Sequence, residues 1–200
     1  DESDPQRASQ RVAVKQLLAA SAKITNRAEL HAFAYALIEI ADPVATAEGL
    51  KSENSNVKRV ALLALDQMDG GGLKPEQVTP LLSSTDAQLN ETARWIVSQH
   101  PEWGGELAGY FEHQISKVPL EPRRDEILEG QLTQFSTHPA IQELLAKSVV
   151  EQKLHTSARH MSLSAIGNSK PKELPPLWAD SLAKVLANDA SLKGVAIETA

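Results

Sequence analysis

Cysteine is absent from this 200-residue chain. Its absence excludes disulfides, thiolate nucleophiles, cysteine-based zinc or iron–sulfur sites and covalent attachment of haem within these residues. The absence of cysteine does not indicate a cellular compartment, because secreted, periplasmic and cytoplasmic settings are all compatible with a cysteine-free chain. We expect no bound cofactor.

Long hydrophobic runs are absent too. No stretch approaches the ~18 apolar residues of a membrane span, and the first residues, Asp1 to Asp4, do not form a signal peptide. We therefore expect no direct membrane insertion. The chain lacks an initiator Met and stops, at Ile197 to Ala200, inside what reads as a helix. We expect it to be a fragment of a longer protein.

Aromatic residues and positive charge are both scarce. Aromatics make up 4% of a chain that is 42% hydrophobic, so most apolar residues are Ala, Leu, Val and Ile. Such side chains suit helices packed closely on helices. The formal net charge is −6. Nucleic-acid binders gain most of their non-specific affinity from clustered Lys and Arg, so we expect no nucleic-acid partner.

Helical periodicity is what the sequence has in abundance. Val57, Val60, Ala61, Ala64 and Met68 follow the spacing of one helix face, and no run shows sustained two-residue alternation. Helix starts are indicated by Asp4-Pro5, Asp42-Pro43, Lys74-Pro75, His138-Pro139, Thr85 (with Gln88) and Asp189, and ends by Gly70-Gly71-Gly72, Gly104-Gly105 and Gly167-Asn168. We predict helices near 5–22, 27–40, 43–52, 55–69, 75–84, 86–99, 104–117, 122–136, 139–152, 156–167, 175–188 and from 190 onward.

Twelve helices joined by short turns would pair into hairpins that repeat at a regular interval. Val57 and Leu89 are 32 residues apart, and Ala158 and Leu192 are 34 apart. A period in the thirties with two helices per unit is typical of a solenoid, in which each hairpin buries its apolar face against its neighbours. We predict an all-α fold, an α-α superhelix of about five to six hairpins that forms one repeat domain over residues 1–200.

The second helices of these hairpins resemble HEAT repeats. The best example has a polar turn, a Val-basic pair, and Ala and Leu at helical spacing: Asn56-Val57-Lys58-Arg59-Val60-Ala61-Leu62-Leu63-Ala64-Leu65. Weaker examples begin at Leu89, Ala158 and Leu192. The resemblance covers most of the chain and implies a HEAT-like solenoid.

A narrower resemblance covers about residues 56–111. Ala64 to Gly72, then Pro80-Leu81-Leu82 and His100-Pro101-Glu102-Trp103, look like the HEAT segment of planctomycete-type multidomain proteins. In that family a predicted membrane-bound dehydrogenase propeller precedes the HEAT segment, and a haem-binding Cys-x-x-Cys-His domain follows it. The resemblance implies a connector in a periplasmic or other extracytoplasmic protein, with a cytoplasmic location as the alternative. Neither flanking motif occurs in these residues, so no activity is transferred.

The residues suggest no catalytic or metal centre. His155 and His160 are five positions apart and turn to different helix faces, and no His-Glu-x-x-His pattern occurs. Asp125 and Glu129 share a helix face, but the neighbouring Arg123 and Arg124 favour a solvated ion-pair surface. We expect no catalytic residue, no cofactor-binding residue and no metal ligand.

A basic series is the main candidate for partner binding. It falls on successive second helices and contains Lys58, Arg94, Arg124, Arg159 and Lys193. One interpretation is a ladder of hydrogen bonds between stacked turns, and the other is a groove for an acidic partner segment. Among the tryptophans, Trp95 is expected in the core, while Trp103 either packs at a repeat junction or stands exposed as a partner anchor.

We therefore predict a non-enzymatic scaffold that binds protein, either flanking domains of the same chain or a separate partner. The resemblance specifies a connector between a dehydrogenase-like propeller and a c-type haem domain. Two alternatives stay open, a HEAT-like protein that binds or processes nucleic acid and a general peptide-binding adaptor.

Overall fold

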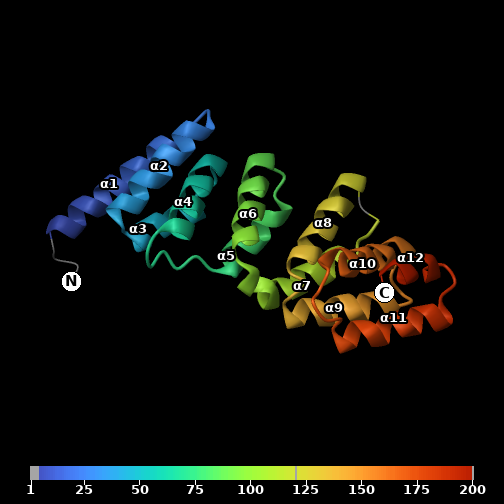
Figure 1. Ribbon diagram of the computed structural model, residues 1–200. Helices are drawn as coiled ribbons and strands as arrows, with labels where there is room; N and C mark the ends of the chain where they lie inside the picture. The colour runs from blue at the N-terminus through green and yellow to red at the C-terminus, as the bar shows by residue number, and fades with distance from the viewer. Residues whose placement is uncertain (1–4, 120, 200) are drawn as a thin grey trace. The chain divides into compact units, whose positions relative to one another are not determined.

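The computed structural model describes residues 5–119 and 121–199, and this part of the chain contains helices and turns but no strand (Figure 1). The predicted all-α helical-repeat class is confirmed. The α-helices are α1 (Pro5–Ser21), α2 (Arg27–Ile40), α3 (Pro43–Ala47), α4 (Ser55–Gln67), α5 (Pro75–Val78), α6 (Ala87–Gln99), α7 (Gly104–Ile115), α8 (Pro122–Gln134), α9 (Pro139–Val150), α10 (Thr156–Ser169), α11 (Pro176–Asn188) and α12 (Lys193–Thr199). Three 3₁₀ helices accompany them: η1 (Glu48–Lys51), η2 (Thr79–Ser83) and η3 (Pro101–Trp103).

The helices belong to two compact units, Asp1–Gln99 and His100–Ala200. In the first unit, α2, α4 and α6 are the second members of three successive hairpins, and α4 packs between the other two (Figure 1). Their partners are α1, the α3–η1 segment and the α5–η2 segment. The first unit is therefore a stack of three hairpins.

The second unit also contains three hairpins, and its two layers are regular. The first members α7, α9 and α11 pack in that order, and the second members α8, α10 and α12 pack in the same order. Each hairpin therefore buries its apolar side against the next one, which is the packing expected of a helical repeat.

Helix α4 shows how the sequence pattern produces the core of the first unit. Seven of its residues are buried: Val57, Val60, Ala61, Leu62, Leu63, Ala64 and Leu65. Apolar residues occupy more than one side of this helix because α2 and α6 flank it while α1 and α3 also pack on it. The helix is buried on several sides, as its sequence predicts.

Side-chain hydrogen bonds between neighbouring hairpins follow the predicted period. The amide of Asn56 donates to the carbonyl of Ile24, 32 residues earlier, at 3.1 Å. The hydroxyl of Ser181 lies 3.1 Å from the carbonyl of Ala146, 35 residues earlier. Equivalent positions of successive hairpins are thus in contact at separations in the thirties.

Several predicted helix starts are confirmed at the level of their caps. The carboxylate of Asp42 accepts from the amide of Ala45 at 2.9 Å, so it caps α3. The His138 ring accepts from the amide of Ala140 at 3.3 Å, at the start of α9. Asp4, predicted to cap the first helix, lies outside the described residues.

Two predicted caps are wrong. Asp86, and not Thr85, accepts from the amide of Leu89 at 2.9 Å at the start of α6, because a carboxylate one residue later reaches the third amide of the helix. Asp189 caps no helix start. Its carboxylate binds the turn residue Ser191 and the side chain of Arg159, and α12 begins only at Lys193.

Two short first members also differ from the predicted continuous helices. The segments predicted near 43–52 and 75–84 begin as α-helix and finish as the 3₁₀ helices η1 and η2. Within η1, Gly49 packs closely on α4, since a Cβ at that position would lie 2.7 Å from the Cβ of Ala61. In η2, Pro80 has no amide hydrogen to continue an α-helix. None of the helices in the described ranges combines the length and apolar character that a membrane span requires.

Candidate protein-binding groove

A groove of about 500 Å³ lies on the first unit, where α2, α4 and α6 pack side by side. Its walls come from the turn before α2 together with the start of that helix, from α4 and from α6. Because all three helices are second members of hairpins, the groove runs across the repeat. The volume falls within the ~300–1,000 Å³ range of ligand-binding clefts.

The apolar floor of the groove is an edge of the core. Ile24, Leu30 and Leu63 line it, and their exposed fractions are 8%, 4% and 7%. These residues belong to the same buried cluster as Val14, Leu37 and the centre of α4. An occupant of the groove would therefore rest on a surface that the fold itself holds rigid.

Trp95 is the large aromatic side chain of the groove, and 43% of it is exposed. The sequence interpretation of Trp95 as a core residue is wrong. Leu89, Ala93, Ile96 and Val97 fill the core face of α6, and Trp95 lies outside that stripe because each residue of a helix is rotated by about 100° from the last. An exposed indole beside an apolar floor is typical of a binding anchor.

Arg59 joins α4 to α6 inside the groove wall. Its Nε donates to the hydroxyl of Thr92 at 3.2 Å, and its Nη1 donates to the amide oxygen of Gln88 at 2.8 Å. Burial lowers the pKa of the guanidinium, and the nearby carboxylates of Asp86 and Glu91 oppose that shift. The Arg59 guanidinium remains charged, because a guanidinium keeps its proton at any ordinary pH.

Arg27 and His31 form the opposite wall, at the start of α2. The Nε of Arg27 donates to Nε2 of His31 at 3.1 Å, and both side chains are exposed. The helix start itself is well fixed, because Asn26 caps the amide of Glu29 at 3.0 Å. Glu29 in turn accepts from the amide of Thr25 at 2.8 Å, and this bond lowers the pKa of the Glu29 carboxyl.

The predicted basic series does not come together as one site. Lys58 and Arg94 are half-buried in the first unit on α4 and α6, and neither lines the groove. The Nε of Arg94 is buried and has no hydrogen-bond partner among the described residues. Arg124 and Lys193 are exposed in the second unit, on α8 and α12.

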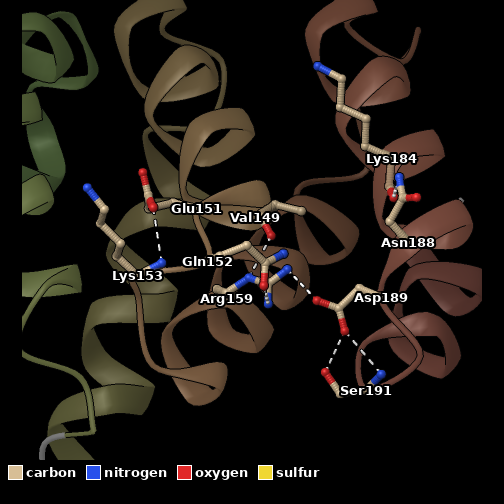
Figure 2. A network of polar contacts seen from close by, with 9 residues as sticks. All are labelled: Val149, Glu151, Gln152, Lys153, Arg159, Lys184, Asn188, Asp189 and Ser191. Atoms are coloured by element: carbon tan, nitrogen blue, oxygen red, sulfur yellow. Dashed lines mark hydrogen bonds and ion pairs between the residues drawn. The ribbon is translucent and has the colours of Figure 1, made fainter.

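Arg159 is the most deeply placed member of that series (Figure 2). Only 4% of it is exposed, and its Nε donates to the carbonyl of Val149 at 3.0 Å. Its Nη2 lies 2.5 Å from Oδ2 of Asp189, whose carboxylate also accepts from the amide of Ser191 at 3.1 Å. Arg159 therefore links α10 to the turn after α11, which fits the interpretation of hydrogen bonds between stacked turns. Its guanidinium is buried, so it does not form a cationic site on the surface.

Trp103 is also buried, with 7% of its surface exposed. Its ring stacks on that of His100, with centroids 4.0 Å apart and an angle of 7° between the planes. Trp178, the third tryptophan, is 1% exposed and donates from Nε1 to the carbonyl of Gln142 at 3.0 Å. Of the three tryptophans, only Trp95 presents a substantial face to solvent.

Within the described ranges no group of three or more His, Asp or Glu side chains has a geometry that could hold a metal ion. His138 and His155 both serve as helix caps, since the ring of His155 accepts from the amide of Ser157 at 3.2 Å. The groove combines its shape with an apolar floor and guanidinium groups, and this combination suits the recognition of a binding partner.

Sequence reasoning missed the residues that line the groove, Arg27, His31, Arg59 and Trp95 among them. A signal for Arg59 was present, because it precedes its partner Thr92 by 33 residues, which is one repeat. The exposed position of Trp95 was also encoded in the phase of the α6 stripe. No family model matches the sequence, and no curated protein matches it significantly.

Proposed function

We propose that this protein is a non-catalytic helical-repeat module that binds a segment of protein in the groove across α2, α4 and α6. One observation carries the proposal: the exposed Trp95 lies beside the buried floor of Ile24, Leu30 and Leu63. Tryptophan and arginine are the residues most enriched where interfaces gain their binding energy, and the groove contains both.

Site-specific photocross-linking tests this proposal directly. Trp95 would be replaced by p-benzoylphenylalanine in the full chain, which would be irradiated in its own cells and examined for adducts. The matched control carries the same cross-linker at Val44, which is 69% exposed on α3 and does not line the groove. We expect one dominant protein adduct from position 95 that position 44 does not give. Equal adduct patterns, or none from position 95, would contradict the proposal.

The resemblance to HEAT segments of planctomycete-type proteins suggests the wider setting. We propose that the chain holds a dehydrogenase-like propeller and a c-type haem domain in a fixed relation, in an extracytoplasmic protein. The similar segments at Ala64 to Gly72 and His100 to Trp103 support this. Reading the coding sequence on both sides of the chain tests it. A gene that encodes no propeller upstream and no Cys-x-x-Cys-His downstream would rule out the connector role.

A further inference from the structure

Two helices of the second unit begin with a histidine whose ring caps the helix. The amide of Ala140 donates to Nδ1 of His138 at the start of α9, at 3.3 Å. The amide of Ser157 donates to Nδ1 of His155 at the start of α10, at 3.2 Å. Helices α9 and α10 pack against each other as the middle hairpin of that unit. Both helices of one hairpin therefore depend on the same kind of cap.

This kind of cap requires a neutral ring. In a neutral imidazole one nitrogen carries a proton and the other accepts a hydrogen bond, whereas both nitrogens are donors in the protonated ring. An Nδ1 atom that accepts from a backbone amide loses that bond when it takes up a proton. Protonation also places a positive charge at the positive end of the helix dipole. Both effects weaken the helix start in the same direction.

The ring of His138 is held in place by a second helix. A Cβ at Gly104 would lie 2.6 Å from Cγ of His138, and a Cβ at Gly105 would lie 3.2 Å from its Cε1. The half-buried ring thus packs on the first turn of α7, which limits its rotation into solvent. A protonated His138 would therefore lie beside the positive ends of two helices, α7 and α9.

The first unit caps its helices with other groups. Asn26 caps α2, Asp42 caps α3, Asn54 caps α4 and Asp86 accepts at the start of α6. Amides do not titrate, and histidine is the side chain whose ordinary charge change falls between about pH 5 and pH 8. Mild acid should therefore act on the helix starts of the middle hairpin and leave these four caps intact.

No carboxylate in the described part of the chain forms an ion pair or a hydrogen bond with either ring, so no bound anion compensates a protonated ring. The charged groups at the start of α9 and on the elements packed with it are Glu102, Glu106, Glu143, Lys170 and Asp180. Those at the start of α10, in the turn before it and on the elements packed with it are Arg124, Asp125, Glu151, Lys153, Arg159, His160 and Lys193. Glu102 bonds to His100 instead, at 2.6 Å.

We propose that the hairpin of α9 and α10 is an acid-sensitive element: protonation of His138 and His155 removes both helix caps and loosens the second unit, while the first unit keeps its structure. The stability that the two neutral rings contribute is complete above the histidine range and disappears as the pH falls through it. The device lies in the second unit, so it does not depend on what the groove of the first unit binds.

Urea unfolding of the full chain at pH 8 and at pH 5 tests the proposal. The comparison is with the double variant His138→Asn/His155→Asn, because asparagine is a good helix cap that does not titrate. The emission of Trp103 and Trp178, which are buried in the second unit, would follow the transition. Between the two pH values we expect the folded-to-unfolded ratio of the protein to fall by about tenfold more than that of the double variant.

Two further variants separate the caps from the other histidines. His160→Asn changes an exposed histidine of α10 that caps no helix, so it should keep the full acid dependence. His155→Asn alone changes an exposed cap and should remove part of that dependence. Amide hydrogen exchange of the full chain, corrected for the intrinsic effect of pH, should show protection lost at pH 5 in α9 and α10 and retained in α2 and α4.

Three results would overturn the inference. One is a double variant that keeps the whole acid dependence of the protein, and another is a His160→Asn variant that removes as much of it as the double variant does. The third is an equal loss of exchange protection in the two units. If the double variant does not fold, His155→Asn decides in its place, because an unchanged acid dependence in that variant would contradict the role of the caps.

Discussion

Arg159 and Asp189 connect two hairpins through a buried ion pair. Their side chains are 5% and 10% exposed, and the guanidinium also donates to the carbonyl of Val149. Removing one member of a buried pair leaves the other without compensation in a medium that solvates it poorly. The pair therefore makes the attachment of the last hairpin sensitive to single substitutions.

We expect Asp189→Ala to lower the free energy of unfolding by about 3 kcal/mol. Urea denaturation would measure this. Asp180→Ala is the matched control, because Asp180 is an exposed carboxylate on α11, and surface changes of this kind usually stay within about 0.5 kcal/mol. Equal losses from the two substitutions would show that the ion pair does not hold the hairpin.

The same carboxylate predicts an acid dependence. The hydroxyl of Ser191, followed by the hydrogen bond and charge of Arg159, lowers the pKa of Asp189 from 3.8 to about 2 and outweighs the opposing effect of burial. A lowered folded-state pKa contributes stability above the unfolded value of about 3.9, and this contribution disappears as the pH falls towards the folded value.

Stability should therefore differ between the protein and its Asp189→Asn variant at neutral pH. The difference should shrink between about pH 4 and pH 2, where the native carboxyl takes up its proton. Unfolding free energies measured at intervals over this range would show the convergence. A difference that stays constant down to pH 2 would assign the effect to packing and not to charge.

At the scale of the element, the effect of replacing a glycine with alanine on stability depends on where that glycine lies in its helix. Gly104 and Gly109 both lie in α7. A Cβ at Gly104 would lie 2.6 Å from the Cβ of His138, the residue that caps α9, whereas a Cβ at Gly109 would meet nothing within 4 Å. The start of α7 thus approaches α9 more closely than any other residue type allows.

Gly104→Ala should destabilise the protein by about 1–3 kcal/mol, the usual cost of overpacking. Gly109→Ala should stabilise it by about 0.5–1 kcal/mol, because alanine loses less conformational entropy in a helix. Thermal unfolding of the two variants would compare them within one helix. The same sign for both would contradict the close contact at His138.

Much of the helix pattern could be predicted from the sequence, because caps, prolines and apolar stripes are local. The start of α3 follows from Asp42-Pro43 alone. The close packing of η1 on α4 did not follow, because it depends on how Gly49 approaches Ala61 on another helix. The ion-pair partner of Arg159 could not be identified for the same reason, since Asp189 lies 30 residues away in the next hairpin.

At the scale of the whole molecule, the chain contains two units that each have their own core. The core of the first includes Leu37, Val60 and Ala61, and buried residues of the second include Phe111, Leu132 and Leu145. The sequence period indicated the repeat but did not mark a division after Gln99, because the helices continue at similar intervals on both sides.

We therefore expect residues 1–99 to fold without the rest of the chain. A domain of about 100 residues buries enough surface to be stable alone. Circular dichroism with cooperative urea unfolding would test this, and Trp95, the sole tryptophan of that piece, should emit as a partly exposed indole. A helical but non-cooperative piece would show that the first unit needs the second.

The bonds between α9 and α11 have a consequence for how chain length can vary. Trp178 and Ser181 on α11 reach the carbonyls of Gln142 and Ala146 on α9. One residue inserted into α9 between these two carbonyls would shift one acceptor by about 1.5 Å and turn it by about 100°, so both bonds could not persist. In homologous sequences, insertions and deletions should therefore occur in the turns at 151–155 and 170–175, while α9 and α11 keep a constant number of residues.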